Sequence, residues 1–223
     1  MHDDRVPFTP SFPSLSPLVI VHADDALVAI DKPAGLLSVP GRGADKTDCA
    51  ATRVQAPFPD AQTVHRLDMA TSGLLLFARG AAMQRALSVM FESREVVKHY
   101  EAVVEGWVEQ DEGEIDLPLL ADWPQRPRQK VDRLQGKPSL TRYRVLQRDP
   151  ATHTTRLALQ PLTGRTHQLR VHLLAIGHPI AGDALYATGE VPTAARLMLH
   201  ATRLELRHPV TSQPLTLVST APF

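Results

Sequence analysis

The sequence holds a single cysteine, Cys49, and no Cys-x-x-Cys pair. An internal disulfide is therefore excluded, and so are the usual structural zinc sites built on cysteine pairs. The sequence also lacks an apolar run of roughly 18 residues, which a membrane-spanning helix needs. Its N-terminus lacks the basic and apolar regions of a signal peptide. We therefore expect a cytoplasmic protein with no membrane association.

Net charge is absent as well, because 24 Lys and Arg residues balance 24 Asp and Glu residues. Over the whole chain this balance argues against a nucleic-acid partner, since Lys and Arg dominate phosphate binding. The charges are segregated, however: residues 121–148 hold eight basic and two acidic residues, whereas residues 100–120 hold seven acidic and no basic ones. Such a pattern either orients an anionic ligand onto one face or marks a solvated hairpin.

The 223 residues are enough for one large domain. Residues 1–16 are rich in proline, with Ser and Thr and no periodicity, which is typical of a flexible arm. No shift of composition divides the remainder. We expect a single domain over residues 17–223.

Strands outnumber helices in the hydrophobic pattern and do not alternate strictly with them. This order favours the α+β class, with a large mixed or mostly antiparallel sheet flanked by helices and loops. Apolar runs predict strands, and a 3.6-residue period predicts helices. The strands are expected as a pair within 18–32, at 72–80, within 98–108, and at about 139–147, 155–160, 197–206 and 214–219; the helices are expected at 81–92 and 166–177, the second capped by Thr166.

The stretch HRLDMATSG, residues 65–73, places Asp68 before a buried apolar strand. A carboxylate at such a position can be a nucleophile, a general base or simply a turn-former. An aspartic protease would need a second Asp-Thr-Gly copy, which is missing, and a phosphoaspartate enzyme of the haloacid type would need an aspartate where Ala70 stands. Glycoside hydrolysis would need a second acid that the sequence alone does not locate.

The stretch TGRTHQLRVH, residues 163–172, carries two arginines near the start of the second expected helix. A cation there opposes the helix dipole, so we expect Arg165 to face an anion or a carboxylate of the protein. Pairing with Asp68 would keep that acid ionised. His167 and His172 lie five residues apart with no acid between them, which disfavours a metal site.

Four segments, in order, resemble the RluA family of pseudouridine synthases. HRLDMATSGLLL is similar to the family's signature loop and strand. The others are DKPAGLLSVPG, KHYEAVVEG with its tyrosine, and GRTHQLRVHLLAIGHPIAGDALY followed by RLMLHA. The resemblance runs from about residue 18 to residue 223. It implies the pseudouridine synthase fold with a catalytic cleft across the sheet.

The resemblance also implies a reaction and its residues. Pseudouridine formation is an isomerisation that needs no cofactor and no metal. By analogy Asp68 attacks the ribose C1′ or the uracil C6, or assists loss of the base, and Arg165 is its ion-pair partner. Tyr100, which on its own would be taken for a core aromatic, stacks on the target base and serves in proton transfer.

RNA is the partner that the resemblance implies. The chain is most similar to the short members that modify both a 23S rRNA hairpin and the tRNA anticodon stem-loop, because ADWPQRPRQKV followed by GKP resembles their basic loop and 17 residues leave no room for an S4-type module. Arg66 resembles the residue that fills the space left by the flipped nucleotide. The RNA contacts are expected from His65, Arg66, Arg126, Arg128, Lys130, Arg142 and Arg170.

Two alternatives stay open on the residues alone. One is a non-catalytic RNA-binding or ribosome-assembly module on the same fold, and the other is a metal-dependent hydrolase that uses the histidines. The full set of Asp68, Tyr100 and Arg165 favours the enzyme, because a binding module has no need of all three. A monomer is the default expectation.

Overall fold

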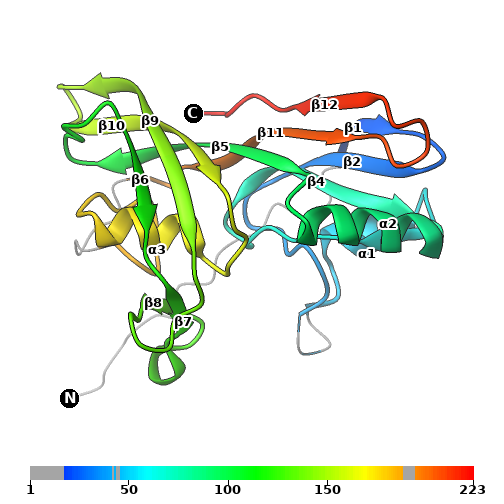
Figure 1. The fold of residues 1–223 in the computed structure, drawn as a ribbon, viewed down its shortest axis with the longest axis horizontal. Helices are drawn as coiled ribbons and strands as arrows, with labels where there is room; N and C mark the ends of the chain where they lie inside the picture. Colours follow the sequence, from blue (N-terminus) through cyan, green and yellow to red (C-terminus); the bar gives the residue numbers. More distant parts are fainter. Residues whose placement is uncertain (1–17, 42, 44–45, 188–193) are drawn as a thin grey trace, which may run out of the picture.

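The computed structural model describes residues 18–223 except 42, 44–45 and 188–193, so the expected arm at 1–16 lies outside the described residues. Ten strands form one sheet in the order β1-β2-β4-β11-β5-β10-β9-β6, with β12 beside β11 and β3 beside β4 (Figure 1). The strands are β1 (Val19–Ala23), β2 (Leu27–Lys32), β3 (Ala61–Thr63), β4 (Ser72–Arg79), β5 (Val97–Glu105), β6 (Glu112–Asp116), β9 (Leu140–Asp149), β10 (Thr154–Pro161), β11 (Leu199–Arg207) and β12 (Pro214–Val218).

The β4–β11 pair is parallel, and the other pairs in this sheet are antiparallel. The expected α+β class with a large, mostly antiparallel sheet is therefore confirmed. Strand β4 is buried on both faces from Leu74 to Ala78, as its continuous apolar run predicts.

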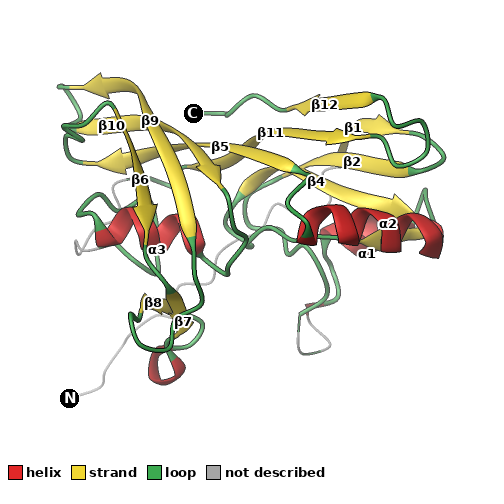
Figure 2. Cartoon of the chain, viewed as in Figure 1, coloured by secondary structure: helices red, strands yellow, loops and turns green. Residues whose placement is uncertain are grey.

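Three helices lie along one side of the sheet: α1 (Ala50–Gln55), α2 (Gly80–Glu92) and α3 (Gln168–Ala175) (Figure 2). Helix α2 buries Leu87 against the cluster that includes β4, and α3 buries Leu169 and Leu173 against β10. The expected start of α3 was wrong by two residues. Thr166 precedes the helix, and the N-cap position belongs to His167, whose left-handed backbone (φ 53°) ends the preceding loop.

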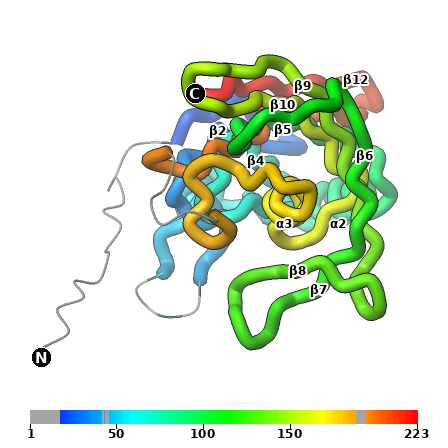
Figure 3. Tube along the Cα trace, turned by 90° about the vertical axis from the view of Figure 1, so that its left-hand side faces the viewer, coloured from blue at the N-terminus to red at the C-terminus, as the bar shows by residue number. Residues whose placement is uncertain are grey.

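A separate two-stranded sheet, β7 (Leu119–Ala121) with β8 (Gln129–Val131), projects from the same side as the helices. We call residues 119–131 the β7–β8 hairpin. In the side view it extends below α3, and the segment that follows β2 extends in the same direction (Figure 3). Tyr186 is buried between the hairpin and α3, with Leu119 and Val171 in its cluster.

The two halves of the large sheet meet where β4 crosses β11. Only two residue pairs join them there, Ser72 with His200 and Gly73 with Ala201. Gly73 has a φ of +107°, and a Cβ on it would lie 2.3 Å from the carbonyl oxygen of Ala201. Glycine is therefore required at this position for two reasons: other residues rarely adopt this φ, and a Cβ would collide with the Ala201 backbone. No helix in the described part of the chain is long and apolar enough to cross a membrane.

Candidate active site

A cavity of about 640 Å³ opens on the helix side of the sheet, between α2 and the loop that leads into α3. Its lining comes from the loop before β4, the end of α2 with Arg94 after it, strand β5, residues 161–170 and Leu199 of β11. The sequence-predicted residues that line it are His65, Arg66, Asp68, Tyr100, Arg165 and Arg170. The fold thus gathers at one cavity six residues that the sequence spreads over about half of the chain.

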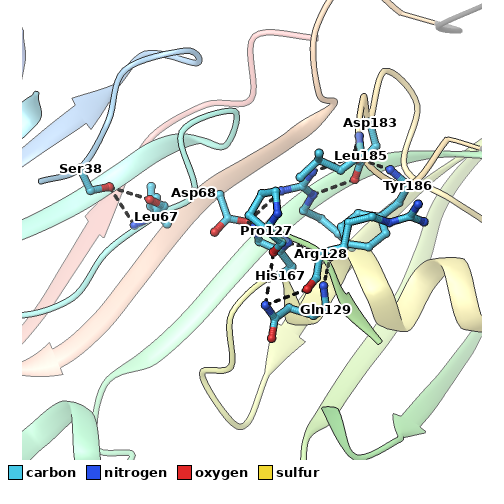
Figure 4. Close-up of polar contacts among 11 residues, drawn as sticks. Ser38, Leu67, Asp68, Pro127, Arg128, Gln129, His167, Asp183, Leu185 and Tyr186 are labelled. Carbon is cyan, nitrogen blue, oxygen red and sulfur yellow. Dashed lines mark hydrogen bonds and ion pairs between the residues drawn. The ribbon is translucent and has the colours of Figure 1, made fainter. Parts of the chain in front are cut away.

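The backbone on either side of Asp68 is held by hydrogen bonds. Leu67 N–H donates to Ser38 Oγ (3.0 Å), and the same hydroxyl donates to the Leu67 carbonyl (2.7 Å) (Figure 4). On the other side, Gly35 N–H donates to the Met69 carbonyl (2.8 Å). Because both neighbours are anchored, the Asp68 side chain projects from a fixed stretch of backbone.

Lys32 is a further anchor of this loop. It is fully buried at the end of β2, and its ammonium donates to the carbonyls of Pro33 (2.9 Å), Leu36 (2.8 Å) and Met69 (3.1 Å). Burial lowers the pKa of Lys32 to about 7, although the charge of nearby Asp68 opposes this effect. Sequence reasoning treated Lys32 only as the end of a strand. The signal that could have found it is a lysine two residues after the apolar run Leu27–Ile30, in the same strand.

Asp68 is ion-paired with Arg170. The Nη1 of Arg170 lies 3.2 Å from Asp68 Oδ2, and its Nε and Nη2 donate to the two oxygens of Asp183 at 2.7 Å each. The side chains of Arg170 and Asp183 are 5% and 1% exposed. Burial lowers the pKa of Arg170, but hydrogen bonds and charge from Asp183 and Asp68 outweigh it and raise the pKa overall. The guanidinium therefore stays charged between two carboxylates.

The expected pairing of Arg165 with Asp68 is thereby corrected. Arg165 lies in the loop before α3, is exposed, and donates from Nε to the carbonyl of Pro138 (3.3 Å). Arg170 lies on the buried face of α3, within reach of Asp68. Arg170 was expected to contact RNA, yet its position inside the protein makes it a partner of carboxylates.

His65 and Arg66 line the cavity in different ways. The His65 ring stacks on Phe91, with centroids 4.5 Å apart, and its Nε2 accepts from Leu76 N–H (2.9 Å). Burial, and then the charge of Lys98, lower the pKa of His65 to about 3, so its ring is neutral. Arg66 is exposed at the cavity mouth. Arg66 is free to meet a ligand, whereas His65 packs the loop onto the strand.

Tyr100 reaches the same cavity from β5. It pairs with Leu159 of β10 and with Ala201 of β11, so its ring stands on a well-supported part of the sheet. Burial, followed by the charge of Asp68, raises the pKa of Tyr100. The phenol is therefore protonated at neutral pH, and the residue lines the cavity.

The basic segment 121–148 is split by the fold. Arg126 packs over the exposed ring of Trp123, Arg128 lies 5.2 Å from the Tyr186 ring centroid, and Lys130 is exposed on β8. These three belong to the β7–β8 hairpin.

Arg142 lies elsewhere, on β9. Its neighbour Thr141 contacts His172 of α3, and side chains alternate along a strand, so Arg142 points to the opposite face of the sheet. There it pairs with Glu114 at 2.7 Å. The structure thus separates Arg142 from the hairpin residues, with which it was expected to contact RNA.

The chemistry of the site is that of a carboxylate beside an arginine and a histidine. Among residues 18–223, apart from the undescribed positions, no group of three or more His, Cys, Asp or Glu residues is arranged to hold a metal ion. Asp68 instead has Arg170 at 3.2 Å and the His167 ring at 3.8 Å. Such a carboxylate can attack an electrophilic carbon as a nucleophile or stabilise a positive charge.

Comparison with known proteins identifies the family. Residues 26–175 match the model of the RNA pseudouridylate synthases. The chain is 51% identical over 200 residues to the dual-specificity RNA pseudouridine synthase RluA of Pasteurella multocida, covering 89% of this chain and 91% of the relative. It is 48% identical over 207 residues to the protein of the same name from Escherichia coli K12, covering 92% and 94%.

A solved structure agrees with these relatives. Human RNA Pseudouridylate Synthase Domain Containing 1 superposes with a TM-score of 0.76 at 30% identity, covering 92% of this chain and 84% of that one. The likeness thus extends over nearly the whole sheet, beyond the residues around the cavity. With both its sequence and its fold shared in this way, the chain belongs to the RNA pseudouridine synthases, which are isomerases.

Proposed function

We propose that this chain converts uridine to pseudouridine in two RNA stem-loops, a 23S rRNA hairpin and the tRNA anticodon stem-loop, with Asp68 as the nucleophile. The observation that carries the proposal is the position of the Asp68 carboxylate. It lies on a loop held by backbone hydrogen bonds, it is paired with Arg170, and it lines the same cavity as Tyr100. The dual substrate is supported by relatives about half identical over most of the chain that bear the name dual-specificity.

The reaction balances without a cofactor. The N1–C1′ bond of the uridine breaks, the uracil turns, a C5–C1′ bond forms, and the C5 proton leaves while N1 gains one. Asp68 attacks C1′ or C6, and the ion pair with Arg170 holds its carboxylate in place until it does so. The Tyr100 ring stacks on the base, and its phenol group serves in proton transfer. Arg165 lies at the cavity edge, where an exposed cation can meet a phosphate.

The target base must leave its stack before any of these steps, at a cost of a few kcal/mol that is smallest in a loop. Arg66, exposed at the cavity mouth, is placed to enter the space that the base vacates. The β7–β8 hairpin supplies three cations for phosphates. It is linked to the cavity lining because Gln129 contacts Tyr186, which contacts His167. Recognition of a loop with splayed bases is typical of RNA rather than of duplex DNA.

We further propose that residues 17–223 act as one catalytic domain, as a monomer in the cytoplasm. The single ten-stranded sheet, which brings segments from both halves of the chain to one cavity, supports the first point. Gel filtration with light scattering would test the monomeric state, because a dimer would show twice the mass of one chain.

The proposal is tested with the purified protein and RNA labelled with tritium at uridine C5. We expect release of label from both a tRNA anticodon stem-loop and a 23S rRNA hairpin, because the C5 proton is lost when the new bond forms. Release from one RNA alone would reject dual specificity. Release from neither, with RNA still bound, would favour a non-catalytic RNA-binding module on this fold.

The hairpin's role is tested by salt dependence. Replacing Arg126, Arg128 and Lys130 together with Gln should weaken stem-loop binding and lower the slope of log K against log salt by roughly 2–3 units, about 0.7–0.9 per lost phosphate contact. The catalytic rate at saturating RNA should change little, because none of the three lines the cavity.

The matched control for the hairpin variant is Arg142→Gln, which removes a cation from the other face of the sheet. Its ion pair with Glu114 is half exposed and contributes little to stability. Affinity and salt slope should stay at wild-type values. If Arg142→Gln lowered the slope of log K against log salt as much per removed charge as the hairpin variant does, the hairpin would not be the specific phosphate-binding surface.

A further inference from the structure

His167 lies between the catalytic carboxylate and a buried tyrosine. Its Nδ1 is 2.7 Å from the hydroxyl of Tyr186, and its Nε2 is 3.8 Å from Asp68 Oδ2 (Figure 4). The histidine side chain is 9% exposed, and its ring meets the Tyr186 ring edge to face. Neither the proposed reaction nor the basic hairpin accounts for this arrangement.

The hydrogen bonds determine which ring nitrogen carries the proton. The backbone N–H of Gln129, in β8, can only donate, and it donates to the Tyr186 hydroxyl oxygen at 2.7 Å. The hydroxyl keeps one hydrogen of its own, and the atom in line to accept it is His167 Nδ1. Nδ1 is then an acceptor, so the neutral ring carries its hydrogen on Nε2, the nitrogen that faces Asp68.

A second observation agrees with this tautomer. A lone pair on Nε2 would face the Asp68 carboxylate unfavourably, whereas an N–H there is attracted to it. Burial lowers the pKa of His167, against the opposing charge of Asp68, so the ring is neutral at physiological pH. The tautomer is therefore fixed from both ends of the ring.

Among the described residues, the polar contacts that reach the Asp68 carboxylate come from Arg170 and His167, and both fall on Oδ2. The Arg170 hydrogen bond at 3.2 Å fixes one side of this oxygen. The His167 Nε2 group at 3.8 Å lies beyond hydrogen-bond distance, and its electrostatic attraction favours the same rotation of the carboxylate. Catalytic groups need such support from neighbours that are themselves held in place.

We propose that His167 is a positioning residue, which orients the Asp68 nucleophile through Nε2–H in a tautomer set by the Tyr186 hydroxyl and the Gln129 backbone. The inference rests on the proposed role of Asp68. It connects the β7–β8 hairpin to the nucleophile, because the Gln129 amide at one end of the chain of hydrogen bonds belongs to that hairpin.

The first test compares two substitutions at His167. In Gln the amide N–H reaches about as far as Nε2, whereas in Asn it reaches only as far as Nδ1. The backbone favours the opposite ranking, because φ is +53° and Asn tolerates that region better than Gln. If backbone strain decides the rate, the Asn variant should therefore be the faster one. If the Nε2–H contact decides it, the Gln variant should be the faster one.

We expect His167→Gln to keep the single-turnover rate within about fivefold of wild type and His167→Asn to lose roughly tenfold or more, with similar affinity for the stem-loop. Equal rates for the two variants, or a faster Asn variant, would overturn the inference. If the wild-type protein released no tritium at all, the proposed function would fail instead, which separates the two conclusions.

The second test does not depend on activity. Nitrogen NMR of ¹⁵N-histidine-labelled protein distinguishes a protonated ring nitrogen from an unprotonated one. In the wild type His167 should show Nε2 protonated and Nδ1 unprotonated, and Tyr186→Phe should shift the Nδ1 resonance, because Nδ1 loses its hydrogen-bond donor. A protonated Nδ1 in the wild type, or an unchanged spectrum in Tyr186→Phe, would overturn the inference.

Discussion

Asp68→Asn is expected to stop pseudouridine formation while leaving RNA binding intact. Asn has nearly the same shape but carries no charge and is a poor nucleophile, so the step that the carboxylate performs is lost. We expect the single-turnover rate to fall by more than about 10³-fold, which corresponds to roughly 4 kcal/mol in the barrier. Tritium release measures the rate, and a filter-binding titration with the same stem-loop measures the affinity.

The fold should survive this change, because Arg170 keeps its two bonds to Asp183 when Asp68 becomes neutral. Asp25→Asn is the matched control, since it makes the same chemical change on an exposed turn between β1 and β2. The control should release tritium at the wild-type rate. Turnover near wild type in Asp68→Asn would remove Asp68 from its role and, with it, the proposed mechanism.

Arg170→Gln is expected to reduce both stability and activity, and this distinguishes Arg170 from Arg165. With the guanidinium gone, Asp183 becomes a carboxylate that is 1% exposed and has lost its cation. Breaking a buried pair in this way costs about 3–5 kcal/mol. At about 2–4 °C per kcal/mol for a protein of this size, the Tm should fall by roughly 10 °C.

Activity should fall further than the loss of folded protein explains, because Asp68 also loses its partner at 3.2 Å. Arg165→Gln is the control. It lies on the surface, so its free energy of unfolding should change by less than about 0.5 kcal/mol. Thermal melts and single-turnover rates of the two variants decide the matter: if Arg165→Gln were the more damaging, the ion pair would not be what keeps Asp68 competent.

Strongly periodic parts of the sequence predicted their structure well. The apolar run of β4 and the 3.6-residue stripe of α2 need no information from elsewhere in the chain. The short elements α1, β3, β6, β7 and β8 were missed. Strand β6 carries charged residues and forms the edge beside β9, so its pairing rather than its composition makes it a strand.

At the site, the sequence predicted Asp68 and Tyr100, which line one cavity. However, it paired Asp68 with Arg165 rather than with Arg170. An arginine near the N-terminus of a helix opposes the helix dipole and is therefore expected beside an anion. This argument applies equally to Arg165 and Arg170. What decides is burial: Arg170 points inward, toward Asp183 thirteen residues later. A tertiary contact of this kind is not visible in local sequence.

For Arg142, by contrast, the sequence alone was enough to predict on which face of the sheet the side chain lies. A count of basic residues treats residues 121–148 as one surface, although a strand sends alternate side chains to opposite faces. Thr141 and Arg142 are neighbours in β9, and only one of them can face α3. Assigning the faces of that strand first would have separated Arg142 from the hairpin.

The missing side chain of Gly73 also links the two sides of the active site. Gly73 pairs with Ala201 across β4 and β11, and Ala201 pairs with Tyr100 across β11 and β5, so the three residues form one row of the sheet. The loop that carries Asp68 leads into β4, and Tyr100 stands at the far end of the row. A Cβ at position 73 would meet the Ala201 carbonyl oxygen at 2.3 Å and push β4 away from β11. The strand that follows the nucleophile would thereby move relative to the strand that holds the aromatic ring.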